Sequence, residues 1–187
     1  MTNLSVEIIN QLSDNYSYLI FDSSTSSSIV IDPAEHEKII PFLKKKNLKL
    51  DYILITHHHS DHTSGVKGLM EEYPNANIFS PSELLNLKIN KISNGNKIKT
   101  SFNEFHVLSA PGHTLDHIIL CDKKNNLLFV GDVLFRLGCG RIFEGTIEQM
   151  HTSLNKIFDL SDNMKVFCGH EYTLNNLKFL EHIFFQN

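Results

Sequence analysis

The stretch that decides the fold and the chemistry of this chain is Thr56-His57-His58-His59-Ser60-Asp61-His62. Alternate spacing turns His57 and His59 to the same side of an extended segment, whereas His58 points away and is expected to support the site from outside. A turn after His59 then directs Asp61 and His62 to the same point. Imidazoles and carboxylates are good ligands for zinc and similar divalent ions. Because one ion cannot easily take four ligands from so short a stretch, the block predicts two ions about 3.5–4 Å apart.

Further ligands occur at three other places, and a glycine precedes each of them: His113, Asp132 and His170. A glycine leaves room for the backbone to approach a crowded site. His117 follows closely after His113 and is a candidate for orienting a ligand through a hydrogen bond. The remaining histidines are expected to have ordinary structural or surface roles; they are His36, His106, His151 and His182.

Strand-like and helix-like segments are mixed along the whole chain. Short β-prone runs predict strands over residues 6–12, 16–21, 28–31, 51–56, 78–79, 102–108, 118–121, 127–130 and 165–168. Amphipathic or Pro-initiated segments predict helices over residues 35–46, 64–73, 81–87, 146–160 and 174–185. No repeat or Pro/Gly-rich linker divides residues 1–187, so one α/β domain is expected. Each candidate ligand falls after a predicted strand, where α/β folds place their functional sites.

The composition narrows the class of protein. The chain has 187 residues, of which 41% are hydrophobic and 20% charged, as is usual for a soluble globular domain. Its formal net charge of −4 disfavours a nucleic-acid partner, because backbone binding needs clustered Lys and Arg. The apolar runs are far shorter than the roughly 20 residues that span a bilayer, so no membrane partner is expected. Three widely spaced cysteines and an N-terminus without a signal-peptide pattern predict a cytoplasmic location.

Residues 56–62, followed in order by His113, Asp132 and His170, resemble the metallo-β-lactamase superfamily. That resemblance implies a four-layer αββα sandwich with metal ions at one edge of its sheets. Three further segments are similar to glyoxalase II, the hydroxyacylglutathione hydrolase: Gly138-Cys-Gly-Arg-Ile-Phe-Glu-Gly145, Cys168-Gly-His-Glu-Tyr-Thr173 and Leu12-Ser-Asp-Asn-Tyr16. This narrower resemblance runs over essentially the whole chain.

The resemblance implies a specific ligand set: His57, His59 and His113 on a first ion, Asp61, His62 and His170 on a second, and Asp132 bridging the two. The implied cofactors are two divalent ions, with zinc first and iron or manganese as alternatives. A hydroxide that bridges the ions is the implied nucleophile, with Asp61 and Asp132 as catalytic carboxylates beside it. The implied reaction belongs to methylglyoxal detoxification. It hydrolyses a glutathione thioester, S-D-lactoylglutathione or a related hydroxyacylglutathione, to the hydroxy acid and glutathione.

The substrate side of the resemblance rests on fewer residues. Arg141 and Tyr172 match positions that contact glutathione, and a guanidinium suits a peptide carboxylate. Phe143 stands where a tyrosine is often found, so one hydroxyl contact is lost. Glyoxalase II continues into a C-terminal helical domain, whereas this sequence ends at Asn187. A catalytic domain without that extension, with weaker or altered glutathione recognition, is therefore expected. The apolar stripe of residues 174–187 predicts packing on the domain or self-association.

Two alternative functions remain open at this point. A mononuclear iron enzyme of the same fold, a sulfur (persulfide) dioxygenase, would need only His57, His113 and Asp132. The additional presence of Asp61 and His170 favours two ions. A truncated metal-binding chain with little activity is the second alternative, and it predicts bound metal without thioester turnover.

Overall fold

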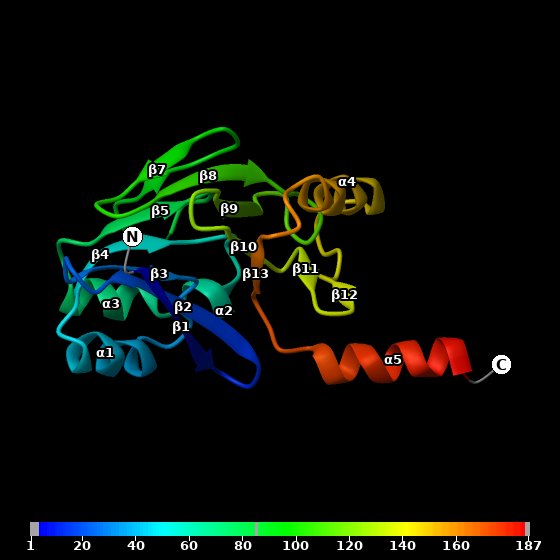
Figure 1. The fold of residues 1–187 in the computed structure, drawn as a ribbon, viewed down its shortest axis with the longest axis horizontal. Helices are drawn as coiled ribbons and strands as arrows, with labels where there is room; N and C mark the ends of the chain where they lie inside the picture. Colours follow the sequence, from blue (N-terminus) through cyan, green and yellow to red (C-terminus); the bar gives the residue numbers. More distant parts are fainter. Residues whose placement is uncertain (1–3, 85, 186–187) are drawn as a thin grey trace.

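The computed structural model describes residues 4–84 and 86–185 and arranges them in four layers (Figure 1). The first sheet has six strands in the order β1-β2-β3-β4-β5-β6, and the second has five in the order β13-β10-β9-β8-β7. The first sheet is built from β1 (Leu4–Gln11), β2 (Asn15–Asp22), β3 (Ser27–Ile31), β4 (Lys49–Leu54), β5 (Asn77–Ser80) and β6 (Asn90–Lys91). The second is built from β7 (Lys97–Lys99), β8 (Glu104–Ser109), β9 (Ile118–Asp122), β10 (Leu127–Gly131) and β13 (Lys165–Cys168).

Helices cover the outer faces of both sheets. The helices α1 (His36–Lys45) and α3 (Val66–Glu72) lie on the first sheet, and α4 (Ile147–Phe158) lies on the second (Figure 1). A short helix, α2 (Ser60–Thr63), follows β4, and a two-stranded hairpin is formed by β11 (Leu134–Phe135) and β12 (Gly138–Cys139). The expected αββα sandwich is therefore confirmed.

Three hydrophobic clusters fill the spaces between the four layers. Phe105 and Phe129 of the second sheet meet Leu54 of the first sheet in the central cluster. The neighbouring Ile53 points the other way and joins Leu43 of α1 in the outer cluster. This alternation follows from the two-residue period of a strand, and it explains why the central strands are apolar on both faces. Together the buried layers fix the sheet edge at which the candidate ligands lie.

The structure corrects the sequence prediction in several places. The helix predicted over residues 64–73 is present as α3 (Val66–Glu72), but the short helix α2 (Ser60–Thr63) that precedes it was not predicted. The described part of the predicted helix over residues 81–87 is not helical; residue 85 lies outside the described residues. There the Ser80 hydroxyl donates to the Ser82 carbonyl at 2.7 Å and accepts from its N–H at 3.3 Å. Such local side-chain bonds compete with a helix.

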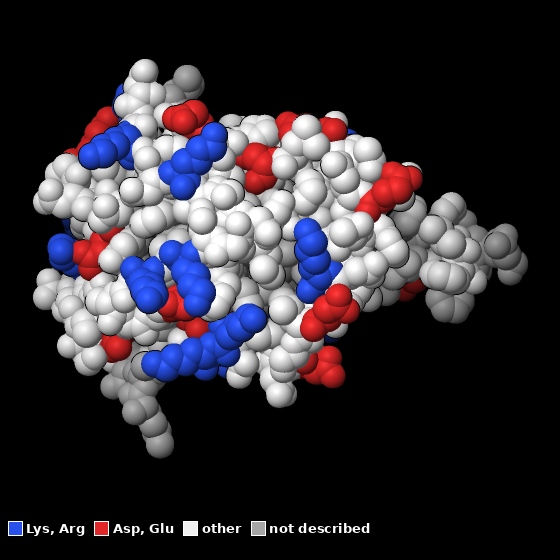
Figure 2. All heavy atoms as spheres, turned by 90° about the horizontal axis from the view of Figure 1, so that it is seen from above, with Lys and Arg blue, Asp and Glu red and all other residues white. Residues whose placement is uncertain are grey.

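Short edge and hairpin strands were not predicted. The strands β6 and β7 close one edge of each sheet, and they are two and three residues long. They are rich in exposed lysine, and so short a segment shows no readable alternation. Both signs of charge occur on the face of the molecule above β7 and β8 (Figure 2). There Lys97 and Lys99 lie 3.3 and 3.7 Å from the Glu104 carboxylate.

The last helix, α5 (Thr173–Phe185), extends away from the sandwich (Figure 1). Its first turn is held by the Asn176 amide, which donates to the Arg136 carbonyl at 3.0 Å. Its apolar side chains are largely exposed, including Leu174 at 72%, Phe179 at 63% and Phe184 at 69%. The sequence predicted that this apolar stripe either packs on the domain or takes part in self-association. Packing on the domain is wrong for these residues. Residues 186–187 of the predicted stripe lie outside the described part of the chain. Within the described ranges no helix is long and apolar enough to cross a membrane.

Candidate metal centre

The candidate ligands come together at one edge of the sandwich, where several strands end. His57 and His59 follow β4, and Asp61 and His62 lie in α2, which begins directly after His59. The other three come from loops after strands of the second sheet: His113 after β8, Asp132 after β10 and His170 after β13. The prediction that every candidate ligand follows a strand, and that all meet, is confirmed by this geometry.

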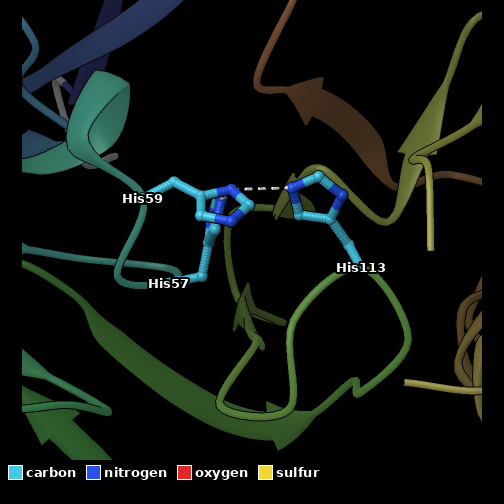
Figure 3. A group of neighbouring side chains, drawn as sticks. All are labelled: His57, His59 and His113. Carbon is cyan, nitrogen blue, oxygen red and sulfur yellow. Dashed lines mark hydrogen bonds between the residues drawn. The ribbon is translucent and has the colours of Figure 1, made fainter. Parts of the chain in front are cut away.

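Three imidazoles form the first group, which we call the histidine group: His57, His59 and His113 (Figure 3). The Nδ1 atom of His59 lies 3.1 Å from His57 Nε2 and 3.0 Å from His113 Nε2. The opposite ring nitrogens of two of them have partners: His113 Nδ1 donates to the Arg141 carbonyl at 2.7 Å, and His57 Nδ1 lies 3.0 Å from the Thr56 hydroxyl. These partners orient His57 Nε2 and His113 Nε2 toward His59 Nδ1, so that three ring nitrogens converge as a metal ion requires.

The second group, which we call the mixed group, contains a carboxylate and two imidazoles: Asp61, His62 and His170. Asp61 Oδ2 lies 3.4 Å from His170 Nε2 and 3.6 Å from His62 Nε2. Asp132 lies between the two groups. Its Oδ2 is 3.3 Å from both His113 Nε2 and His170 Nε2, and its Oδ1 is 3.5 Å from His62 Nε2. One carboxylate therefore contacts a ligand of each group.

Two buried polar atoms without hydrogen-bond partners show that these residues suit divalent cations. His62 Nε2 and Asp132 Oδ1 are buried, and neither has a hydrogen-bond partner. A buried polar atom without a partner is costly, and here the two atoms face the same small space. The neighbouring donors are imidazole nitrogens and carboxylate oxygens, which suit zinc, iron and manganese. The His/Asp groups therefore indicate divalent metal binding.

The two groups differ in electrostatics. Burial lowers the pKa of His57 well below its usual range, and the neighbouring imidazoles lower it further. Burial also opposes protonation of His170, but hydrogen bonds to Asp132 and Asp61 outweigh it and raise the pKa of His170 to about 10. The hydrogen bond with His170 in turn holds the pKa of Asp61 well below its usual range. The carboxylates of the mixed group thus favour positive charge at His170, whereas burial disfavours protonation of His57.

Sequence reasoning missed Asp32, a buried carboxylate that supports both groups. Its Oδ1 accepts from the Thr56 N–H at 2.8 Å, and its Oδ2 accepts from the Thr56 hydroxyl at 2.7 Å. The same Oδ2 lies 3.1 Å from His62 Nδ1, which orients the opposite nitrogen toward the site. Asp32 has a positive φ of 50°, which non-glycine residues seldom adopt. Its position directly after a predicted strand, before Pro33, was the available signal.

Two further histidines lie beside the ligands. His117 is fully buried, stacks on His57 with ring centroids 4.6 Å apart, and accepts the backbone N–H of Asp132 at 3.1 Å. It therefore orients the segment that carries Asp132. His58 points away as expected: its ring nitrogens lie 2.9 Å from Asp116 and 3.2 Å from Glu144.

The glycines before the ligands have different reasons to be there. A Cβ at Gly169 would collide with Asp132 Oδ1 and His62, so this glycine makes room for the site as expected. Gly131 has a φ of +49°, and a Cβ there would meet Thr56 and His117. The expectation is wrong for Gly112, whose space is taken by Met150 of α4. That glycine serves helix packing.

A cavity of about 720 Å³ opens over the ligands. Its wall carries the three residues to which the resemblance assigns substrate contacts. Tyr172 stacks on His170 at 4.8 Å between ring centroids, and the Phe143 ring lies edge-on to His59 at 5.6 Å. The exposed Arg141 guanidinium lies 5.6 Å from the centre of the Phe143 ring. Among the described residues Arg141 forms no salt bridge, so its charge is free to meet an anionic group.

A model of the metallo-beta-lactamase superfamily matches residues 12–88 and 80–170. Solved structures agree with the fold. The BLEG-1 B3 metallo-beta-lactamase superposes with a TM-score of 0.78 and 23% identity, over 89% of this chain and 92% of that one. ETHE1 from Myxococcus xanthus gives a TM-score of 0.79 and 28% identity, over 90% and 76%. The fold and the His/Asp cluster define a protein of the metallo-β-lactamase superfamily.

Proteins with similar sequences identify the family within this superfamily. Hydroxyacylglutathione hydrolase 1 from Vibrio vulnificus (strain YJ016) is 47% identical over 182 residues, which are 97% of this chain and 72% of that protein. The hydroxyacylglutathione hydrolase of Pelagibacter ubique (strain HTCC1062) is 43% identical over 178 residues, 94% and 74% of the two chains. The chain belongs to the hydroxyacylglutathione hydrolase family, also called glyoxalase II, within the superfamily.

Proposed function

We propose that this chain is a binuclear metal-dependent hydrolase of glutathione thioesters, with S-D-lactoylglutathione or a related hydroxyacylglutathione as substrate. The observation that carries the proposal is the pair of ligand groups joined by Asp132, whose carboxylate lies 3.3 Å from a histidine of each group. A mononuclear site would leave the mixed group without a role. The family relatives supply the substrate class, and the cavity over the ligands supplies the space for it.

In this proposal the histidine group would hold a first ion, the mixed group would hold a second, and Asp132 would contribute its carboxylate to both. Zinc is the proposed metal, and iron and manganese suit the same donors. When bound, a pair of divalent ions supplies hydroxide from water near neutral pH and polarises a carbonyl. Asp61 and Asp132 stay ionised, because hydrogen bonds to His170 oppose burial at Asp132 and lower the pKa of both carboxyls. They therefore fix the negative charge of the site.

The cavity wall is the proposed place for the glutathione part. Arg141 offers a free cation for a peptide carboxylate, and Tyr172 offers a hydroxyl beside His170. Phe143 forms an apolar wall next to His59, where no hydroxyl is available. The thiolate that leaves is stable near neutral pH, since an unperturbed Cys-type thiol has a pKa of about 8.5. Little acid catalysis is therefore required of the residues in the wall.

The proposed partner is a small molecule, with neither nucleic acid nor membrane involved, and the proposed location is the cytoplasm. The free thiols Cys121, Cys139 and Cys168 form no disulfide, which agrees with a reducing compartment. We further propose that the sandwich of the two sheets is a single catalytic domain that carries the metal chemistry.

The test is a thioester panel on protein of measured metal content. Lactoylglutathione is assayed beside the same acyl group on a thiol that is not glutathione, and we expect preference for the glutathione thioester at two ions per chain. His59→Ala should lower turnover by at least about 100-fold, since metal polarisation contributes several kcal/mol. His58→Ala, one residue away and turned toward Asp116, is the matched control and should retain activity. Unchanged turnover in His59→Ala would overturn the proposal.

The panel also separates the two alternatives. Oxygen uptake with glutathione persulfide by protein carrying one iron would establish the dioxygenase. Two bound ions without turnover of any thioester would establish a metal-binding chain with little activity.

We also propose that α5 is a surface for a second copy of the chain. Its exposed apolar side chains surround opposite charges, Lys178 and Glu181, three residues apart. Antiparallel pairing about a two-fold axis brings each lysine near the glutamate of the other copy. Sedimentation equilibrium should show a dimer that Phe179→Glu disrupts. Phe158→Glu on α4 is the control, because Phe158 is 67% exposed and Phe179 63%. A monomeric wild-type chain would refute this surface.

A further inference from the structure

The turn between β1 and β2 reaches the mixed group from the far end of the chain. Asp14 lies in this turn and Asn15 begins β2, whereas His170 follows β13, the strand at the edge of the other sheet. Asp14 Oδ1 accepts a hydrogen bond from His170 Nδ1 at 2.8 Å across 156 positions of sequence. That bond fixes the ring so that its Nε2 faces Asp61 and Asp132, 3.4 and 3.3 Å away.

The neighbouring residue acts on a different ligand. The Asn15 amide donates to Asp61 Oδ2 at 2.9 Å and to the Asp61 backbone carbonyl at 3.2 Å. Asn15 is only 5% exposed, so its amide is held in place by its surroundings. The Asn15 amide also lies 3.5 Å from His170 Nε2. The consecutive residues Asp14 and Asn15 therefore orient two candidate ligands, Asp61 and His170, that come from different layers.

Backbone bonds fix the turn against the end of β13. The Glu171 N–H donates to the Asp14 carbonyl, and the Tyr16 N–H donates to the Gly169 carbonyl, both at 2.8 Å. These two bonds enclose His170 on both sides, and Asn15 pairs with His170 as an isolated bridge. The contact is thus part of the fold and does not depend on one mobile side chain.

The histidine group lacks this support. Among the described residues, no hydrogen bond or ion pair joins residues 12–16 to His57, His59 or His113. Those ligands are oriented instead by Thr56 and by the Arg141 carbonyl. The β1–β2 turn therefore contacts ligands of the mixed group only.

We propose that Asp14 and Asn15 are positioning residues that set the metal affinity of the mixed group independently of the histidine group. The inference rests on the binuclear site of the proposed function. Hydrogen-bond partners of metal ligands fix ring orientation and ligand basicity, and their loss typically costs about 10–100-fold in metal affinity. Since the turn contacts one group, that loss should fall on one ion.

The experiment measures zinc per chain after equilibration with a series of chelator concentrations. Wild-type protein should release its two ions at defined concentrations. Asp14→Ala should release one ion at about 10–100-fold less chelator and keep the other unchanged. Asp14→Asn retains a neutral acceptor for His170, so it should release that ion at a chelator concentration between those of the wild type and Asp14→Ala. It replaces Asp14→Ala in the experiment if the alanine variant does not fold. Asn15→Ala should act in the same direction as Asp14→Ala.

Asp116→Asn is the matched control, because Asp116 forms an equivalent carboxylate–imidazole pair with His58 at 2.9 Å but contacts no proposed ligand. Its two ions should be released as in the wild type. Cobalt-substituted protein gives an independent readout, since the absorption of one ion should change in Asp14→Asn. Parallel release of both ions, or release identical to the wild type in both Asp14 variants, would overturn the inference. Selective release without thioester turnover would uphold it and refute the proposed substrate.

Discussion

The histidine group and the mixed group sit side by side, yet they differ in charge and in the contacts that support them. In the histidine group, His57 and His59 come from one short loop, and burial keeps the His57 imidazole neutral. In the mixed group, His170 hydrogen-bonds to Asp14 from the other end of the chain and lies near two further carboxylates. Each group joins two residues that are close in sequence to a third, His113 or His170, from the second sheet. The groups differ in charge, because the mixed group gathers carboxylates around His170, and in support, because only His170 hydrogen-bonds to Asp14 among the described contacts of these two distant histidines.

This difference predicts that the two proposed ions respond differently to loss of a carboxylate and to pH. Asp132 couples the two directly, because one of its oxygens lies 3.3 Å from a histidine of each group. Four experiments test this comparison, in order of decreasing expected effect. They are substitution of Asp132, substitution of Asp32, acidification, and substitution of Arg141 in the cavity wall.

The largest effect is expected for Asp132→Ala. Removing the shared carboxylate leaves both groups short of a ligand, so turnover should fall by more than about 100-fold, a loss of roughly 3 kcal/mol in transition-state stabilisation. Steady-state kinetics together with metal analysis check this. Asp162→Ala, on the exposed turn before β13, is the control. An Asp132→Ala protein that keeps two ions and its activity would show that the groups are independent.

A smaller effect is expected for Asp32→Asn, and it should be larger for the mixed group, which Asp32 contacts directly at His62, than for the histidine group, which it reaches through Thr56. The asparagine keeps the shape of the side chain but has one acceptor oxygen in place of two, so either Thr56 or His62 Nδ1, 3.1 Å away, loses its acceptor. Zinc affinity of the mixed group should fall about 10–100-fold. Competition with a chelator measures it. Asp22→Asn, equally buried at the far end of β2, should leave both affinities unchanged.

Acidification should release the ion of the mixed group first. The pKa of His170 is raised to about 10, so at neutral pH the metal must displace a proton from it. Its affinity should then fall about tenfold for each unit of pH lost. Since the pKa of His57 is well below its usual range, protons compete for that ligand only at much lower pH. Zinc content after dialysis between pH 8 and 5.5 should fall from two to one; a parallel loss of both ions would contradict the comparison.

The smallest effect is expected at the cavity wall. Arg141 is exposed, and exposed ion pairs contribute about 0.2–1 kcal/mol. Arg141→Ala should raise KM for a glutathione thioester by about 1.4- to fivefold, the factor to which that energy range corresponds, with kcat nearly unchanged. Arg136→Ala on the neighbouring hairpin is the control. A large fall in kcat would mean that Arg141 acts on the reacting atoms.

Sequence patterns predicted the cluster better than they predicted its supports. Each candidate ligand lies in the cluster, because alternation and strand ends are visible in the local sequence. Asp32 was missed because its partners, Thr56 and His62, are distant in sequence and become neighbours only through the pairing of β3 with β4. The segment 81–87 was mistaken for a helix because the serine hydroxyl bonds that replace a helix leave no periodic signal.

The donor types, their order along the chain and the strands that they follow can all be read from the local sequence. They follow from side-chain chemistry and from periods of two and 3.6 residues, which act over a few positions. By contrast, the contact of Asp132 with both groups and the orientation of His170 by the β1–β2 turn exist only once the chain has folded. Those contacts join residues up to 156 positions apart. They form because burial of three apolar clusters fixes the two sheets against each other, and no local pattern encodes the result.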